Sequence, residues 1–318
     1  MHSLLDVQKG YSYKTLILMR NLLTTMILLG ILFSNDSPYV VVLGIAQDGG
    51  MPHAGCEKTC CKGLWMTNNG EKVSCIGIVD PRTKKSWMID ATPDLPEQLR
   101  TLTLIHKTEL AGIFLTHAHM GHYIGLLQLG REVMGAENIP IFAMPKMKSF
   151  LENNGPWSQL LELENIKIES LKDGKELKIG KQLFIEPFLV PHRDEYSETV
   201  GYRIIGPEKS LIYIPDIDKW GKWEQNIFQI VMNIDIALID GTFFSQDELP
   251  HRNMNEIPHP FITESIETLF GLSTPHRNKV HFIHLNHSNP AIKRDSAAGN
   301  YITSKRFNIA RENNQFNL

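Results

Sequence analysis

Short apolar runs that end at a histidine or an aspartate recur along this chain. Residues 111–116 (Ala-Gly-Ile-Phe-Leu-Thr) lead directly into His-Ala-His-Met-Gly-His at 117–122. Later apolar runs end at single polar residues: His192, Asp216, Asp240 and His284. Runs of this length, rich in β-branched residues and separated by helical stretches, are typical of strands in an α/β domain. The pattern predicts that these strand ends converge on one functional edge.

The remaining segments continue the alternation of strands and helices. We expect strands at 39–45, 112–116, 139–143, 182–190, 236–239 and 280–283, hairpins at 73–79 with 86–90 and at 199–205 with 210–214, and helices at 93–101 and 124–134. The chain has 318 residues, of which 42% are hydrophobic and 21% are charged, as in an ordinary globular protein. Residues 37–318 are therefore expected to form one domain with two sheets covered by helices.

The motif at 117–122 has the spacing of a metal site. At a strand end, positions i and i+2 point the same way, so His117 and His119 are placed to bind one cation. His122 follows where the chain turns into a helix, and from there it faces a second cation. Incidental histidines in a polar loop are the alternative. Gly121 stands where a carboxylate would be expected in such a motif.

Residues 1–36 are predicted to be a signal peptide or an N-terminal anchor. An apolar stretch at 21–33 follows Arg20 and precedes the polar residues 34–37. This stretch is shorter than the roughly 20 apolar residues of a membrane span, which favours a secretory signal over an uncleaved anchor. The expected location is secreted or periplasmic, with membrane contact only through that anchor.

Three of the four cysteines are clustered, at Cys56, Cys60 and Cys61, whereas Cys75 lies within an apolar run. Export would favour a disulfide, but adjacent cysteines rarely bridge each other. A structural zinc held by these thiols and a distant histidine accounts for the cluster better, with a disulfide or free buried thiols as alternatives. Cys75 is expected to be a small core residue.

The formal net charge of −3 provides no basic footprint. Binding of nucleic acid is therefore not expected. The expected partner is a small-molecule substrate, and a homodimer is left open.

The ordered set of motifs resembles the metallo-β-lactamase fold superfamily. The matching pieces are Thr-His-Ala-His-Met-Gly-His at 116–122, Pro-His at 191–192, Pro-Asp at 215–216 and Ile-His at 283–284. The segments 42–56, 240–243, 258–260 and 285–290 look like the branch of pyrroloquinoline quinone biosynthesis protein B (PqqB). The resemblance implies an αβ/βα four-layer sandwich with metals at one edge of the two sheets.

The resemblance also implies the metal ligands. A first metal would be held by His117, His119 and His192, and a second by His122 and His284, with Asp216 bridging the two. Zn²⁺ suits this ligand set, as one or two ions, and Mn²⁺ or Fe²⁺ would also fit.

Further residues receive roles from the same resemblance. His259 resembles the non-ligand histidine that serves the leaving group as a catalytic acid, although a solvent-exposed loop histidine is the alternative. In a related phosphonate-pathway cyclic phosphodiesterase, a similar His-x-x-His sends its second imidazole to a structural zinc. That would tie His287 to the clustered cysteines, with His53 as the alternative ligand. Asp90 or Asp94 is expected to orient a ligand histidine, and Asp240 either does the same or caps a turn.

The leading functional hypothesis is a metal-dependent hydrolase in which metal-bound hydroxide attacks an ester, a lactone or a phosphodiester. Hydrolytic relatives carry an Asp where this chain has Gly121, which predicts a weak or empty second metal site. A PqqB-like iron-dependent oxidation of a tyrosine-bearing peptide needs only one redox metal and is the second hypothesis. A non-catalytic metal- or ligand-binding module is the third.

Overall fold

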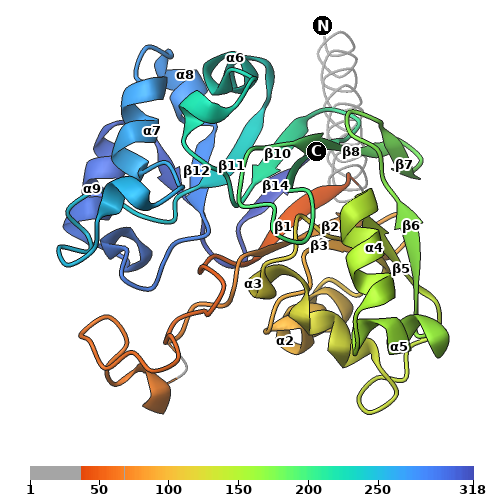
Figure 1. Ribbon diagram of the computed structural model, residues 1–318. Coiled ribbons are helices and arrows are strands. Elements are labelled where there is room, and N and C mark those ends of the chain that lie inside the picture. The colour runs from red at the N-terminus through yellow and green to blue at the C-terminus, as the bar shows by residue number, and fades with distance from the viewer. Residues whose placement is uncertain (1–36, 68) are drawn as a thin grey trace, which may run out of the picture. The chain divides into compact units, whose positions relative to one another are not determined.

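A computed structural model describes residues 37–318 except Asn68, and it shows two packed seven-stranded sheets with helices on their outer faces (Figure 1). Residues 38–318 form one compact unit. The predicted signal peptide or anchor at 1–36 lies outside the described residues. Among the helices of the described part, none has the length and apolar character needed to cross a membrane. The predicted α/β four-layer sandwich is confirmed.

In each sheet most neighbouring strands are also consecutive in the sequence. The first contains, in spatial order, β14 (Gln315–Asn317), β1 (Tyr39–Gly44), β2 (Cys75–Asp80), β3 (Lys85–Ile89), β4 (Glu109–Phe114), β5 (Ile139–Ala143) and β6 (Ile166–Ser170). The second contains β13 (Asn308–Ile309), β12 (Val280–Ile283), β11 (Ile236–Asp240), β10 (Ser210–Ile214), β9 (Val200–Ile205), β8 (Leu183–Leu189) and β7 (Leu177–Gly180). Both predicted hairpins, β2 with β3 and β9 with β10, are antiparallel pairs and are confirmed.

The helices are short and lie outside the sheets. They are α2 (Leu95–Arg100), α3 (Met120–Tyr123), α4 (Pro145–Asn153), α5 (Trp157–Glu162), α6 (Ile227–Asn233), α7 (Ile262–Leu269), α8 (Thr274–Arg277) and α9 (Ala297–Ser304). Short 3-10 helices occur at Leu64–Met66, Ile124–Leu129, Trp220–Lys222, Met254–Glu256 and Pro290–Ile292, and a π-helical turn at Thr101–Ile105 extends α2. In Figure 1, α2, α4 and α5 lie beside the first sheet, and α6 to α9 lie beside the second.

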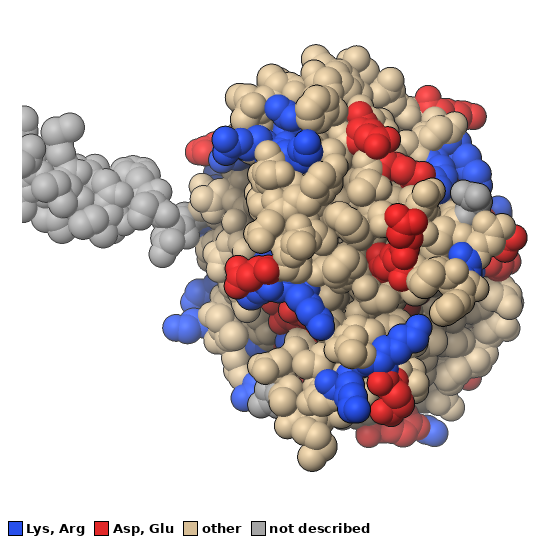
Figure 2. Space-filling model, turned by 90° about the vertical axis from the view of Figure 1, so that its left-hand side faces the viewer, with Lys and Arg blue, Asp and Glu red and all other residues tan. Residues whose placement is uncertain are grey.

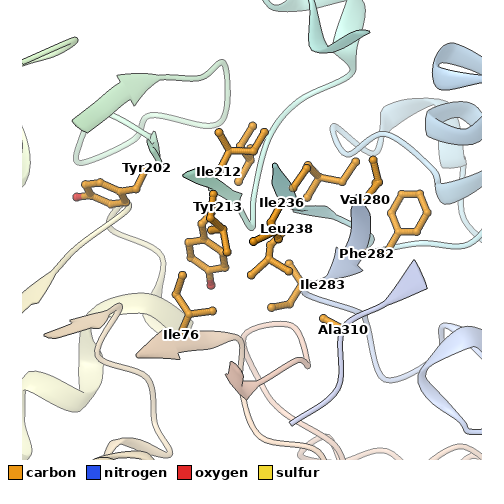
Figure 3. Close-up of a cluster of buried hydrophobic side chains, with 14 of the residues drawn as sticks. Ile76, Tyr202, Ile212, Tyr213, Ile236, Leu238, Val280, Phe282, Ile283 and Ala310 are labelled. Carbon is orange, nitrogen blue, oxygen red and sulfur yellow. The ribbon is translucent and has the colours of Figure 1, made fainter. Parts of the chain in front are cut away.

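Continuous apolar runs form the central strands because both faces of these strands are buried. In β1 every residue after Tyr39 is buried, and all five residues of β11 are buried. Buried side chains of both sheets, including Ile76, Tyr202 and Tyr213, meet in the cluster of Figure 3. Cys75 is fully buried on the helix-covered side of the first sheet, which confirms its predicted place in the core. Sheets buried on both faces hold the strand ends rigidly, and the polar residues follow those ends.

The helix expected at 124–134 is present only in part. After the single turn of α3, a 3-10 helix covers Ile124–Leu129, and residues 130–134 are not helical. The His122 carbonyl accepts a hydrogen bond from the Ala91 amide at 2.8 Å, and the Gly125 amide donates to the Ala91 carbonyl at 2.9 Å. These groups therefore bond to the end of β3 rather than to a longer helix. The interruption fixes His122 against β3.

Candidate metal centre

One edge of the two sheets collects the polar residues that follow the strands. Asp90 comes directly after β3, the histidine motif after β4, His192 after β8, and Asp216 after β10. Asp240 is the last residue of β11, and His284 follows β12. The predicted convergence of these side chains on one site is therefore present in the structure.

A first group contains His117, His119, His192 and Asp216, with one ligand atom of each residue within 4.8 Å of the others. Asp216 Oδ2 lies 3.3 Å from His117 Nε2 and 3.9 Å from His119 Nδ1. The other oxygen, Oδ1, lies 3.2 Å from His192 Nε2. These are the residues that the family resemblance assigns to the first metal.

A second group contains His122, His284 and Asp48. Asp216 Oδ2 lies 4.0 Å from Nε2 of both histidines, so this one oxygen faces both groups. Asp48 Oδ1 lies 3.3 Å from His122 Nε2 and 3.9 Å from His284 Nε2. The expectation of a weak second site assumed that Gly121 leaves this group without a carboxylate of its own. That assumption is wrong, because Asp48 occupies the position.

The two groups fit divalent cations. Ligand atoms about 2.0–2.1 Å from a tetrahedral ion lie about 3.3 Å apart, close to the shorter separations here. The facing atoms are buried and have no hydrogen-bond partner: His117 Nε2, His119 Nδ1, His122 Nε2, His192 Nε2, His284 Nε2, Asp48 Oδ1 and Asp216 Oδ1. Because buried polar atoms are otherwise hydrogen-bonded, this concentration of unpaired lone pairs is the signature of metal ligands.

Hydrogen bonds behind the histidines orient the rings. Asp90 Oδ2 lies 2.7 Å from His122 Nδ1, and Thr116 Oγ1 lies 3.0 Å from His117 Nδ1. Thr242 Oγ1 similarly lies 3.0 Å from His284 Nδ1. Such partners fix which ring nitrogen faces the metal. The expectation that Asp90 or Asp94 orients a ligand is met by Asp90.

Two residues of this edge adopt left-handed backbone conformations. Asp90 has φ 75° and His284 has φ 62°, values that non-glycine residues seldom adopt. Such strain persists only where the surroundings determine it, and it is concentrated at functional sites. At both positions the strained residue ends a strand and turns its side chain toward the centre.

The charges within the centre keep its carboxylates ionised. Burial alone would raise the pKa of Asp216, but His192, His259 and the other imidazoles hold it well below the usual range. Burial would likewise raise the pKa of Asp48, but His122 and His284 keep it well below that range. Two ionised carboxylates that face buried imidazoles are the electrostatic environment that a cation compensates.

His259 lies beside the first group and is buried, so the alternative of a solvent-exposed loop histidine is excluded. Its Nδ1 lies 2.8 Å from Asp240 Oδ2 and 3.1 Å from Asp216 Oδ1. Burial lowers the pKa of His259, but these two carboxylates outweigh it and raise the pKa to about 10. Asp240 also accepts hydrogen bonds from the backbone and hydroxyl of Thr242. Asp240 thus positions His259 and does not simply cap a turn.

The clustered cysteines form a separate group with His287, with ligand atoms within 4.8 Å of one another. All four cysteines of the chain are free, which excludes the predicted alternative of a disulfide. His53 stacks on the His287 ring at 4.3 Å between centroids, and its Nδ1 lies 3.0 Å from the Ala54 carbonyl. His287 is therefore the residue that completes the group, and His53 supports it.

Asp48 is the one member of the two groups that was not among the predicted ligands. It lies in the segment 42–56 that resembles PqqB, within a turn closed by a 2.8 Å hydrogen bond from the Gly50 amide to the Gln47 carbonyl. The aspartate within it was a potential signal, because the motif at 117–122 lacked a carboxylate. Asp94 does not contact a ligand histidine. It accepts a 2.8 Å hydrogen bond from the Val73 amide.

The surface carries charges of both signs. On the face shown in Figure 2, Lys and Arg are interspersed with Asp and Glu, and apolar and neutral residues cover most of the area. A cavity of about 710 Å³ beside the Asp48 loop is lined by residues 49–52, 65, 67, 70–73, 93, 94 and 97. None of the histidines of the metal centre lines it, so this cavity is not the metal centre.

Comparison with known proteins finds a matching family model and similar curated proteins. A model of the β-lactamase superfamily domain matches residues 87–285, which include both groups of histidines but not Asp48 or the cysteines. The chain is 25% identical over 288 residues to coenzyme PQQ synthesis protein B of Acinetobacter baumannii, covering 81% of this chain and 93% of that protein. It is 24% identical over 293 residues to the same protein of Nitrosococcus oceani, covering 80% and 92%.

Solved structures show the same architecture. The Zn²⁺-bound PqqB of Methylobacterium extorquens has a TM-score of 0.75 at 21% identity and covers 88% of this chain and 100% of that chain. A diphosphatase of the PhnP family has a TM-score of 0.60 at 19% identity, covering 88% and 97%. These likenesses show a metallo-β-lactamase fold that is similar to PqqB, and the family model shows that the chain belongs to the β-lactamase superfamily domain family.

Proposed function

We propose that the protein is a metal-dependent hydrolase that acts on an ester, a lactone or a phosphodiester. The observation that carries this proposal is the position of Asp216, whose Oδ2 faces imidazoles of both histidine groups within 4.0 Å. One carboxylate shared by two groups of unpaired nitrogens is the arrangement of a two-metal centre. A bound metal pair supplies an activated water and neutralises charge on the attacked and leaving oxygens.

The chain's own residues have distinct parts in this proposal. Asp216 holds the two ligand groups together, and hydrogen bonds that the Nδ1 atoms of His122 and His284 donate to Asp90 and Thr242 orient the two rings. His259, fixed through Nδ1 by Asp240, is positioned beside Asp216 to deliver a proton to a leaving group. We assign Zn²⁺ to the centre, with Mn²⁺ or Fe²⁺ as alternatives that fit the same ligands.

Metal removal and reloading test the hydrolase proposal. The protein is stripped with a chelator, reloaded with Zn²⁺ or Mn²⁺, and assayed against a nitrophenyl ester, a lactone and bis(4-nitrophenyl) phosphate. We expect hydrolysis of one class that is lost on stripping and in His117→Ala and returns with metal. A wild-type protein that binds metal but turns over none of these substrates would instead support a metal-binding module.

A PqqB-like oxidation is the second candidate, favoured by the similarity to coenzyme PQQ synthesis protein B over 80% to 81% of this chain. In that case the centre would hold Fe²⁺ and consume oxygen with a tyrosine-bearing peptide. Anaerobic loading with Fe²⁺, followed by an oxygen-uptake assay with such a peptide, separates the two candidates. Peptide-dependent uptake without hydrolysis would replace the hydrolase proposal.

We also propose a structural zinc at the group of Cys56, Cys60, Cys61 and His287. Cys56 Sγ and Cys60 Sγ lie 3.6 Å apart, and Cys61 Sγ accepts a hydrogen bond from the His53 amide at 3.3 Å. Thiolate and imidazole ligands of this number form a closed tetrahedral zinc site. Cys61→Ser is expected to reduce the zinc content by one ion per chain while the two-metal centre still binds its metals.

A further inference from the structure

We propose that Asp48, from the loop after β1, is the carboxylate ligand of the second metal, and that Gly121 is the vacancy in the histidine motif that admits it. The ligand has thus moved from the motif itself to a distant part of the chain. This inference rests on the proposed two-metal centre, and nothing in the family-model match at 87–285 reaches Asp48.

Backbone pairing places Asp48 beside the second group. The Leu285 amide donates to the Ile45 carbonyl at 2.7 Å, and the Gln47 amide donates to the Leu285 carbonyl at 2.9 Å. Leu285 directly follows His284, so this pairing fixes the start of the 47–50 turn against a ligand histidine. The position of Asp48 is therefore determined by the sheet edge rather than by a free loop.

Gly121 provides the space that Asp48 occupies. A Cβ atom at position 121 would lie 2.5 Å from Asp48 Cα and would also collide with Asp48 Oδ1. Real Cβ atoms do not approach other atoms so closely, so no other residue fits at position 121 while Asp48 stays in place. Gly121 stands where hydrolytic relatives have a ligand Asp, and it also leaves the space that Asp48 occupies.

The Asp48 carboxylate is set up as a ligand rather than as a turn cap. Its Oδ1 is buried, has no hydrogen-bond partner, and lies 3.3 Å from His122 Nε2. The Nε2 atoms of His122 and His284 are also buried and unpaired. Three unpaired buried ligand atoms facing one point form a three-residue metal group, which Asp216 Oδ2 completes from 4.0 Å. A side chain that only stabilised the turn would direct its oxygens to backbone amides.

Metal binding by Asp48→Asn tests the assignment. Asn keeps the shape of the side chain but is neutral and a much weaker ligand. Zn²⁺ content per chain is measured by elemental analysis, and stepwise affinities are measured by competition with a chromophoric chelator. We expect the second metal of the centre to bind about 10- to 100-fold more weakly and the first to change less than about 3-fold.

Two reference variants calibrate this result. His122→Ala should remove the second metal, whereas Asp173→Asn, an exposed carboxylate that accepts only the Leu189 amide, should bind metal as the wild type does. Retention of the first metal in Asp48→Asn reports that the centre is still folded. Unchanged affinity for both metals in Asp48→Asn, with loss of one in His122→Ala, would overturn the assignment.

Gly121→Ala gives an independent test. Its Cβ would collide with Asp48 Cα and Oδ1, so we expect it to displace the Asp48 carboxylate and to weaken binding of the second metal by about 10-fold or more, while the first metal is retained. Unchanged affinity for the second metal in Gly121→Ala would contradict the idea that the space left by Gly121 is what admits Asp48. These measurements do not depend on turnover. A wild-type protein that binds both metals without hydrolysis would therefore refute the proposed function but not the role of Asp48.

Discussion

The two ligand groups of the centre differ in where they come from and in how firmly they are held. The first group lies within the chain segment from the histidine motif to Asp216, and its His119 is 15% exposed and contacts the exposed Glu195. The second group joins the loop after β1 to the ends of β4 and β12, and its two histidines are completely buried. Each group thus has one partly exposed ligand, His119 in the first and Asp48, at 28%, in the second, whereas only the second group has both of its histidines fully enclosed.

The contacts behind the histidines also differ between the two groups. His122 Nδ1 has a 2.7 Å contact with the buried Asp90, whereas His192 Nδ1 lies 3.3 Å from Asp218 and forms no hydrogen bond with it. A tightly bonded ring loses little freedom on binding a metal, while a loosely held ring must be ordered at that moment. We therefore expect the second group to depend more strongly on its outer partners than the first group does.

Removing the shared carboxylate should abolish the difference between the groups. In Asp216→Ala both metals lose a ligand, so we expect less than one metal per chain in the centre and a fall in hydrolytic kcat/KM of about 10³-fold or more. Elemental analysis and steady-state kinetics measure these quantities. Two tightly bound metals in this variant would show that Asp216 does not link the groups.

Asp90→Asn should weaken the second group selectively. The Asn oxygen can still accept the Thr116 amide, but its NH₂ group would then face His122 Nδ1, which needs an acceptor. We expect the second metal to bind about 10- to 100-fold more weakly, as measured by chelator competition. An equal loss of both metals would mean that the Asp90–Thr116 contact supports the first group as strongly as the second.

Asp218→Asn is the corresponding change behind the first group and should have a smaller effect. Because His192 Nδ1 and Asp218 Oδ1 are not hydrogen-bonded, the change removes only a weak orienting interaction with the ring, together with an ion pair to the exposed Lys222. We expect less than about 5-fold weaker binding of the first metal in the same competition assay. A loss as large as that in Asp90→Asn would reverse the comparison between the groups.

Glu248→Gln should alter stability through the segment that follows His284. Ser288 Oγ donates to Glu248, and burial raises the pKa of Glu248 to about 7. Because the folded pKa exceeds the ordinary value, protonation favours the folded state, and this stability is full below about pH 4.5 and lost as pH rises through 7. Glu248→Gln should therefore raise the free energy of unfolding by about 1 to 3 kcal/mol at pH 8.5.

Urea unfolding at pH 8.5 and at pH 4.5 measures this effect, which should largely disappear at the lower pH. A stabilisation of equal size at both values would show that the gain comes from packing rather than from ionisation.

Many elements of the fold were predictable because their signals are local. Each central strand is a continuous apolar run, and each predicted ligand histidine follows such a run. The shortening of the helix expected at 124–134 was not predictable, because it depends on tertiary hydrogen bonds: the His122 carbonyl accepts from the Ala91 amide, and the Gly125 amide donates to the Ala91 carbonyl. The choice between His53 and His287 also depended on the tertiary structure. His53 is close to the cysteines in the sequence, whereas His287 comes close to them only in the fold.

By itself, the sequence determined a sandwich of apolar strands whose ends carry histidines and carboxylates, because burial and residue spacing act over a few neighbouring positions. Tertiary structure alone decided which carboxylate serves the second group. Gly121 looks like a missing ligand until the pairing of Ile45 and Gln47 with Leu285 brings Asp48 into the same space. No local pattern records that contact, because backbone hydrogen bonds between opposite ends of the domain create it.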